Sequence, residues 1–409
     1  MLLQEMKKIW RPGILLVLLL LGTAYYTMYL EGPIVYNLGE NLATGELPVA
    51  EQWVVEYGTT ISPEEMAEIE STRPALELEA DAWIAQNPIA QTYGLTNYAD
   101  FQWFLNEYYY TASGELKDEA WDQYADANRM LSYLSGEETG NIAGRLYTVN
   151  LYTEFYAVRQ QYGPKVSTAE YDRGYTEREW SHILETFFGP DEAWQNLLPA
   201  EVPGATSIFF ASLLVWMVLS VGLFLSPVLV RDKMRRMESL QYASRRGRGL
   251  AKTQFTAAML SAVILTTVNL LIFGGMFLRN GTIAFADCRM YSFTMTGFCW
   301  PNWTYGTWCI VLTLMCYAVT LGFGAMAWFL AGTSSNYIAM LLKLIPLFVC
   351  AAIVLQKTMT DAFYFSNSLY RSFRVPYIEG VVTIAVLLIG LSLYITGYRR
   401  IKRKDLFVS

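Results

Sequence analysis

The feature that most constrains this chain is a long run without charge. From Met290 to Leu342 there is no Asp, Glu, Lys or Arg. A soluble domain needs a wetted face, and globular proteins are typically about 25% charged, whereas this chain of 409 residues is 16% charged and 53% hydrophobic. Its 61 aromatic residues also exclude a disordered chain. The composition therefore predicts a membrane protein and excludes a cytosolic enzyme.

A helix that crosses a bilayer needs about 20 mostly apolar residues. Six segments qualify, and we expect each to be a transmembrane helix: residues 12–30, 206–230, 254–278, 307–331, 337–356 and 380–398. The alternative, a stack of buried helices in a soluble protein, is disfavoured because such helices are usually shorter. The first span could instead be a cleaved signal peptide, but it is long for one and lacks a clean cleavage site.

Charge is divided unevenly along the chain. Residues 31–205 hold 30 acidic and 8 basic residues, a net charge of −22, while the remainder carries +15. The acidic block would repel phosphates, so we do not expect a nucleic-acid partner. Outside that block, Lys and Arg gather before the first span, in residues 231–252 and after the last span.

Loops rich in Lys and Arg face the cytoplasm. With six spans, the three basic sites fall on one side, so both termini are expected to be cytoplasmic and residues 31–205 extracellular. The uncharged turn at residues 332–336 is assigned to the cytoplasmic side only by counting spans.

The acidic block has mainly helical signals. Capping boxes are expected at Ser62/Glu65 and Thr176/Glu179, and Asn97 is expected to cap a further helix. Two amphipathic stripes follow, Phe101, Phe104, Leu105, Tyr108 and Trp180, Ile183, Leu184, Phe187. Longer helices are predicted near residues 115–134 and 141–161, the second ended by Gly163-Pro164, and residues 35–60 are expected to hold a short strand or two. The sequence thus predicts an all-α membrane protein with a mainly helical extracellular domain between spans one and two.

Two features of this domain have alternative interpretations. The aromatic stripes are expected to form its core, although they could line a ligand groove. Asp118, Asp122 and Asp126 share one helix face and could hold a cation, but the spacing lacks the central Gly and bidentate Glu of a calcium loop. We therefore expect a solvated acidic face and no metal site.

The five cysteines all follow the acidic block. Cys288 and Cys299 lie in the outer loop after span three, where an oxidising environment would allow a disulfide, worth about 3 kcal/mol for so short a loop. The alternative is a pair of buried apolar thiols. Cys309, Cys316 and Cys350 are expected to be core residues of spans.

Catalytic motifs were sought without success. A single histidine, His182, excludes H-E-x-x-H, and there is no G-x-S-x-G. Residues 247–253 resemble a phosphate loop but lack the Gly before the Lys. We predict no catalytic residue and no cofactor. Lys343 is expected to snorkel to the inner surface and Glu379 to lie at the outer mouth of span six, with a charge in a transport pathway as the alternative role of each.

The loop between spans two and three reads RDKMRRMESLQYASRRGRGLAK over residues 231–252. Met234, Met237, Leu240 and Tyr242 form a narrow apolar stripe between basic clusters, which predicts a short amphipathic helix. Such a helix could lie on anionic lipid, at about 1 kcal/mol per Lys or Arg, or contact a cytoplasmic protein.

With this loop the chain resembles the permease subunits of type-2 ABC exporters, in the subgroup with a large extracellular domain. The Gly247-Arg248 pair and Lys252 after the loop are similar to the family's pattern, as is the tail from Tyr398-Arg399-Arg400 to Asp405. The family's frequent Gly-Thr pair before the loop is missing. The implied order is an interfacial helix (1–11), span one (12–30), the extracellular domain (31–205), span two (206–230), a coupling loop (231–252), and spans three to six with a basic tail (253–409).

The resemblance implies a multi-pass subunit of a bacterial cell membrane that forms the pathway as a homodimer or heterodimer. Two separate ATPase subunits would bind ATP and Mg²⁺ and push on the coupling helix. The implied coupling residues are Met234, Met237, Glu238, Leu240, Tyr242, Arg245, Arg246 and Arg248.

The cargo would be an antimicrobial peptide, a drug or a cation, the last suggested by the acidic domain. The main alternative is a membrane sensor or regulatory subunit that uses the acidic domain as a ligand receptor, and a membrane enzyme is disfavoured by the missing motifs.

Overall fold

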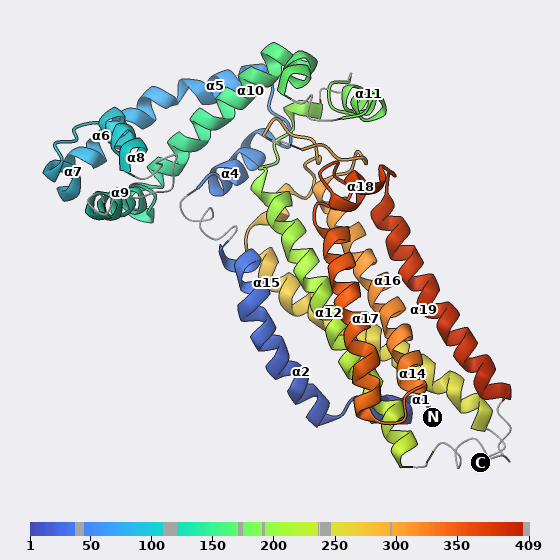
Figure 1. The fold of residues 1–409 in the computed structure, drawn as a ribbon. Coiled ribbons are helices and arrows are strands. Elements are labelled where there is room, and N and C mark those ends of the chain that lie inside the picture. Colours follow the sequence, from blue (N-terminus) through green and yellow to red (C-terminus); the bar gives the residue numbers. More distant parts are fainter. Residues whose placement is uncertain are drawn as a thin grey trace.

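The computed structural model describes residues 1–36, 45–108, 121–170, 175–189, 193–235, 237, 247–294 and 297–403. Figure 1 shows a bundle of long helices and, projecting from one end of it, an arm of further helices. We call the helices from α4 (Leu47–Tyr57) to α10 (Ile142–Glu170) the arm, and α4 is its base. Helix α1 (Leu2–Ile9) and the last turns of α19 lie at the opposite end of the bundle.

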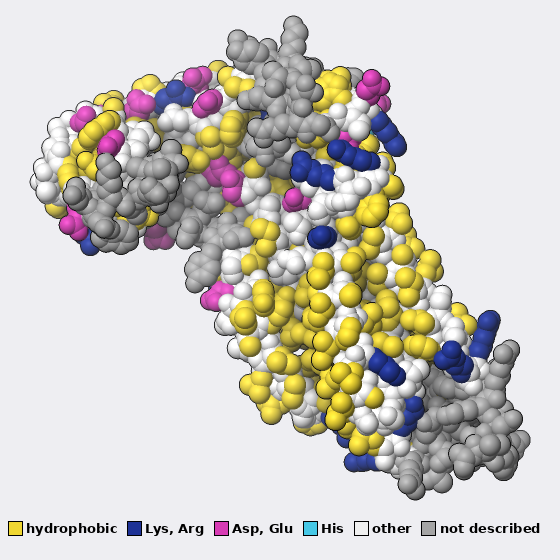
Figure 2. Space-filling view, viewed as in Figure 1, with side chains coloured by type: hydrophobic (Ala, Val, Ile, Leu, Met, Phe, Trp, Pro, Cys, Tyr) yellow, Lys and Arg dark blue, Asp and Glu magenta, His cyan; other side chains and the backbone are white. Residues whose placement is uncertain are grey.

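Six helices are long and apolar enough to cross a membrane, as predicted. They are α2 with η1 (Pro12–Tyr25, Tyr26–Leu30), α12 (Glu201–Met234), α14 with η6 and α15 (Gly247–Asn269, Leu270–Gly274, Gly275–Leu278), α16 (Tyr305–Gly332), α17 (Tyr337–Met359) and α19 (Ile378–Arg403). Hydrophobic side chains cover the visible face of the bundle between its two ends (Figure 2).

Helix α12 is the centre of the bundle. In its most apolar stretch 72% of residues are buried, against 17% in α17 and 17% in α19. It packs against α16, α17, α14 and α2. The most peripheral helices therefore expose their apolar faces, as expected of surfaces that meet lipid.

Small residues allow the closest helix contacts of the bundle. A Cβ at Gly390 of α19 would lie 2.2 Å from the Gly322 carbonyl oxygen of α16, and a Cβ at Gly322 would lie 2.6 Å from that of Val386. A Cβ at Gly22 of α2 would lie 2.9 Å from the Trp216 ring of α12. Gly390 and Gly322 therefore allow two helix backbones to approach closely, and Gly22 leaves room for the Trp216 ring.

All regular secondary structure described between the first two spans is helical. Its elements are η2 (Gly32–Tyr36), α4 (Leu47–Tyr57), α5 (Pro63–Ser71), α6 (Arg73–Gln86), α7 (Pro88–Thr92), α8 (Tyr98–Tyr108), α9 (Trp121–Leu134), η4 (Glu137–Thr139), α10 (Ile142–Glu170), α11 (Glu177–Thr186) and η5 (Ala193–Gln195). Within the described residues there is no strand, only isolated bridges such as Thr60 to Asn196. An all-α fold is thus confirmed.

The helix starts predicted from capping motifs in the sequence are confirmed. Both capping boxes are present, with Glu65 N–H donating to Ser62 Oγ and Glu179 N–H to Thr176 Oγ1. Asn97 Oδ1 accepts from Asp100 N–H at 2.9 Å at the start of α8. The stripe on α8 is core, because Phe101, Phe104 and Leu105 are fully buried.

Three expectations for this segment were wrong. The strand expected within residues 35–60 is replaced by α4, whose Leu47, Val49, Ala50 and Trp53 form a buried helical face. Helix α10 does not end at Gly163-Pro164 but continues to Glu170, since one proline removes a single backbone hydrogen bond. Trp180 is only half-buried and stacks on Tyr175 at 6.4 Å, so it is not a central core residue.

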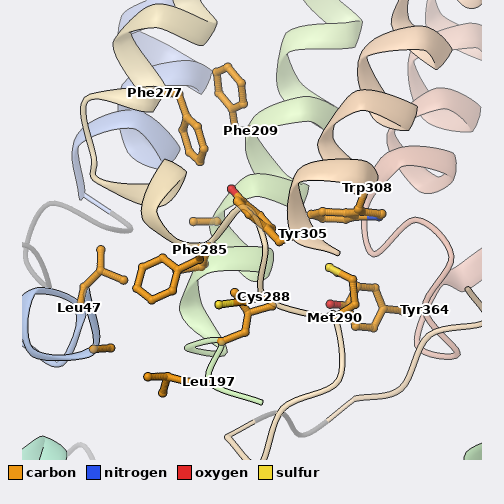
Figure 3. Close-up of a cluster of buried hydrophobic side chains, with 14 of the residues drawn as sticks. Leu47, Leu197, Phe209, Phe277, Phe285, Cys288, Met290, Tyr305, Trp308 and Tyr364 are labelled. Atoms are coloured by element: carbon orange, nitrogen blue, oxygen red, sulfur yellow. The ribbon is translucent and has the colours of Figure 1, made fainter. Parts of the chain in front are cut away.

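The bundle and the arm share one hydrophobic core. Figure 3 shows Leu47 of α4 and Leu197 together with Phe209 of α12, Phe277 of α15 and Phe285 of η7 (Thr282–Phe285). All five side chains are buried. Phe209 and Phe277 stack with ring centroids 4.4 Å apart. The base of the arm is therefore packed against the ends of spans two and three.

Candidate functional site

The described parts of the predicted coupling segment, residues 231–235, 237 and 247–252, lie at the end of the bundle remote from the arm, which we call the basic end. It contains α1, the last turns of α12, the first turns of α14 and the turn at residues 333–336. Lys and Arg side chains are visible here beside the hydrophobic surface (Figure 2).

Three cations at the basic end donate to backbone carbonyls. Arg231 Nη2 donates to the Lys8 carbonyl at 3.3 Å, and Lys233 Nζ donates to the carbonyls of Gly332 and Ser334, the latter at 3.3 Å. Lys343 Nζ donates to the Thr333 carbonyl at 3.1 Å. Positive charges are favoured at such helix C-termini because unpaired carbonyls concentrate negative potential there.

These contacts locate two predicted features. The uncharged turn after α16 lies at the same end as the basic loop, because Lys233 reaches it. Lys343 bends toward that turn and its side chain is exposed. Its position is that of a snorkelling lysine.

Helix α1 is tied to the start of span three. Trp10 Nε1 donates to Ser261 Oγ of α14 at 3.0 Å, and the Trp10 ring meets Phe224 of α12 edge-on with centroids 5.0 Å apart. Ile9 is buried, and Lys8 pairs with Glu5 at 2.6 Å. One face of α1 is therefore fixed to two spans, while Leu3 on another face is exposed.

Two of the predicted coupling residues can be placed. Met234 ends α12 with 55% of its surface exposed, and Met237 is 42% exposed. Arg248 lies in the first turn of α14, but its side chain is not described. The other predicted coupling residues lie outside the described residues: Glu238, Leu240, Tyr242, Arg245 and Arg246. Their part in coupling stays a prediction.

At the arm end, Glu379 is a buried group at the start of span six. It is 1% exposed, and its Oε1 accepts from Phe363 N–H at 3.2 Å. Phe363 has a left-handed backbone with φ of 71°, which is costly for an aromatic residue. Glu379 therefore supports a strained loop, and a role in a transport pathway stays a prediction.

The expected disulfide between Cys288 and Cys299 is absent, and both residues are free and buried. Cys299 Sγ donates to the Pro301 carbonyl at 3.3 Å, while Cys288 lies in the cluster of Figure 3. Burial raises the pKa of each thiol to about 12, with a smaller contribution from Asp287 at Cys288. In this structure both thiols pack among buried side chains.

The acidic face proposed for the 115–134 region is partly described. Asp118 lies outside the described residues. Asp126 accepts from the Tyr93 hydroxyl at 3.0 Å and pairs with Arg129 at 3.1 Å. In the part of the chain that is described, no three His, Cys, Asp or Glu side chains are grouped as metal ligands would be.

A connection between α11 and the loop before span six was missed by sequence reasoning. Glu179 is 1% exposed, and its Oε1 accepts from the Tyr370 hydroxyl of α18 (Ser368–Phe373) and from Arg374 Nη1. Burial opposes its ionisation, but the hydrogen bonds from Tyr370, Thr176 and Arg374 outweigh burial and lower its pKa. The capping-box motif in the sequence predicted only the hydrogen bonds between Glu179 and Thr176 at the start of α11.

Two hydrogen bonds between buried polar side chains join neighbouring spans. Trp216 Nε1 donates to Asn269 Oδ1 at 2.8 Å, joining α12 to α14. Thr266 donates to Thr320 Oγ1 at 3.1 Å, joining α14 to α16. These contacts act as links between helices.

Comparison of the chain with models of protein families, with curated proteins and with solved structures gives no match.

Proposed function

We propose that this chain is the permease subunit of an ATP-driven exporter of the type-2 ABC class, with its basic end in the cytoplasm and the arm outside the cell. Two copies, or one copy and a related chain, would enclose the pathway. Two separate ATPase subunits would bind ATP and Mg²⁺ at the basic end.

The observation that carries the proposal is the exposed end of α12. The most buried helix of the bundle ends at exposed Met234, and Met237, three residues further along the chain, is also exposed. Apolar side chains of a helix that enter a groove of a partner are a recurrent binding mode, and exposed methionines adapt well to such grooves. The basic residues around them favour the cytoplasmic side.

The length of α12 supports a mechanical role. Its 34 residues correspond to about 50 Å at 1.5 Å per residue. Near the arm end, Thr206 Oγ1 bonds the Tyr305 hydroxyl of α16 at 2.7 Å. A displacement at Met234 would therefore be transmitted through a packed helix to the contacts that close the outer end of the bundle.

The charge of the acidic segment indicates the chemical class of the cargo. A segment with a net charge of −22 concentrates cations near the outer surface. A basic antimicrobial peptide, a cationic drug or an inorganic cation fits this field.

The test is co-purification from native membranes. The tagged wild-type chain is expected to retain a protein with an ATP-binding phosphate loop, identified by mass spectrometry. Met237→Asp should lose that protein while keeping the yield of the membrane chain. Val55→Asp is the matched control, because Val55 is 82% exposed but belongs to α4 at the other end. Loss of the partner with both variants, or with neither, would contradict the proposal.

A sensor or regulatory subunit is the second candidate, and the attachment of α11 to the loop before span six favours it. A ligand on the acidic segment could change the bundle through this contact. A sensor would retain a partner without a phosphate loop, so the same mass spectrometry separates the two functions.

A further inference from the structure

The loop before span six has both buried and exposed aromatic side chains. Tyr370 of α18 is 2% exposed and makes the contact with α11 described above. Phe373, at the end of the same short helix, is 64% exposed, and Arg371 is exposed as well. Val375 and Tyr377, which follow the helix, are 46% and 44% exposed. We call Arg371, Phe373, Val375 and Tyr377 the interfacial patch.

Hydrogen bonds hold the backbone that carries this patch. Asn367 Oδ1 accepts from Tyr370 N–H at 3.1 Å, and Asn367 Nδ2 donates to the Lys357 carbonyl of α17 at 3.1 Å. Arg374 and Tyr377 have φ of 53° and 58°, in the left-handed region that residues other than glycine rarely occupy. The exposed side chains therefore belong to a loop with a defined conformation.

The interfacial patch adjoins the lipid-facing surface of span six. Tyr377 directly precedes α19, and Val381 and Ile384 of that helix are each 58% exposed. The four residues from Tyr377 to Val381 correspond to about 6 Å of helix. Lys and Arg side chains gather over the position of α18, next to the hydrophobic surface of the bundle (Figures 1 and 2). Aromatic rings at this level of a spanning helix commonly meet lipid headgroups.

Two cations accompany the apolar side chains. Lys357, in the last turn of α17, and Arg371 are both exposed, and neither belongs to an ion pair within the described residues. Asn367 bonds the backbone of both, because its own carbonyl accepts from Arg371 N–H at 2.9 Å. The acidic residues of this loop do not offset them: Asp361 accepts from serine hydroxyls, and Glu379 is buried.

We propose that the interfacial patch docks on the phospholipid headgroups of the leaflet at the arm end of the bundle. Phe373, Val375 and Tyr377 lie at the edge of the hydrocarbon, and Arg371 and Lys357 contact lipid phosphates. A guanidinium matches a phosphate in shape and charge, and cations near the surface favour anionic lipid. The continuity of the patch with the exposed apolar side of α19 makes the bilayer its partner.

Docking would have a consequence for α11. The short helix that carries Phe373 also carries Tyr370, which bonds Glu179 of α11. The bilayer surface would therefore help to fix the position of α11 against the end of the bundle. This inference depends on the membrane fold alone and is independent of the proposed export function.

The test is photocrosslinking of the full chain in nanodiscs that contain equal amounts of phosphatidylglycerol and phosphatidylcholine. Benzoylphenylalanine in place of Phe373 should form lipid adducts, detected by mass, as it should at Ile384. The same probe at Leu78 of α6, which is 70% exposed in the arm, should form none.

The lipid composition of the adducts tests the cations. At position 373 we expect adducts with the anionic lipid to exceed those with the zwitterionic lipid by about threefold or more. Arg371→Gln combined with Lys357→Gln should bring the ratio close to one. Arg279→Gln, on an exposed arginine at the end of span three, is the matched control and should leave the ratio unchanged.

Three results would overturn the proposal. Position 373 would not meet the bilayer if it gave no lipid adduct while position 384 did. Equal adducts with the two lipids in the otherwise wild-type chain would exclude guidance by charge. An adduct with a protein in place of lipid, when the same probe is used in native membranes, would show that a protein covers the patch. If the variant at 373 does not fold, the probe at exposed Tyr377 carries the same expectations.

Discussion

Glu179 and Arg374 are 195 positions apart in the chain, yet Arg374 Nη1 donates to Glu179 Oε1 at 2.8 Å. The same carboxylate closes the capping box of α11 through its other oxygen, which accepts from Thr176 N–H at 2.6 Å. The Glu179 side chain thus caps the first turn of α11 and also attaches that helix to the loop before span six. The φ of Arg374 is 53°, so its backbone is held in a left-handed conformation at this contact.

Removing the arginine should weaken this attachment. Arg374→Ala leaves the buried Glu179 carboxylate without its cation, which should cost about 1–3 kcal/mol. The lower half of that range is expected because the Arg374 side chain is 45% exposed. The measurement is the thermal unfolding midpoint in detergent. Arg371→Ala, on an exposed arginine of α18 with no ion pair in the described residues, is the control and should leave the midpoint unchanged.

The same contact predicts an acid dependence. The pKa of Glu179 is lowered from 4.5, despite burial, by hydrogen bonds from Tyr370, Thr176 and Arg374. Its contribution to stability is therefore present above pH 4.5 and is lost as the pH falls through the folded pKa. The difference in unfolding midpoint between wild type and Glu179→Gln should shrink between pH 5 and pH 3. A constant difference across this range would refute the prediction.

The close crossing of α16 and α19 predicts that a side chain larger than that of glycine is not tolerated at residue 390. A Cβ at Gly390 would lie 2.2 Å from the Gly322 carbonyl oxygen, so Gly390→Ala must push the helices apart. We expect a loss of about 1–3 kcal/mol, the usual cost of overpacking. Gly380→Ala on the same helix has no atom within 4 Å of its Cβ and should be tolerated. Equal unfolding midpoints for the two variants would argue against the close crossing.

Sequence reasoning worked best where the signal is local or compositional. The six spans follow from the length of apolar runs, and the helix caps at Ser62 and Thr176 follow from side chains three residues apart. In each case the physical cause lies within a few turns of one helix.

Tertiary contacts explain what the sequence could not predict. The second role of Glu179 requires residues beyond position 369, which the local helix signal does not include. Cys288 and Cys299 have a spacing that permits a disulfide, but their packing leaves them free. The half-exposure of Trp180 likewise depends on what faces α11.

The orientation of the chain can be tested by labelling. In a background without native cysteines, a Cys placed at Ser113 should react in intact cells with a reagent that cannot cross the membrane, while a Cys at Ser244 should not. Both positions lie outside the described residues, so the test rests on the charge pattern alone. Reaction of both sites, or of Ser244 only, would overturn the proposed topology.

The most direct measurement of the central claim is site-specific photocrosslinking just beyond the end of α12. Benzoylphenylalanine in place of exposed Met237 should form an adduct, in native membranes, with a separate protein that contains an ATP-binding phosphate loop. The same probe at exposed Val55 should not. Adducts of position 237 with lipid alone, while the membrane chain is folded and abundant, would contradict the account of α12 as the contact with an ATPase.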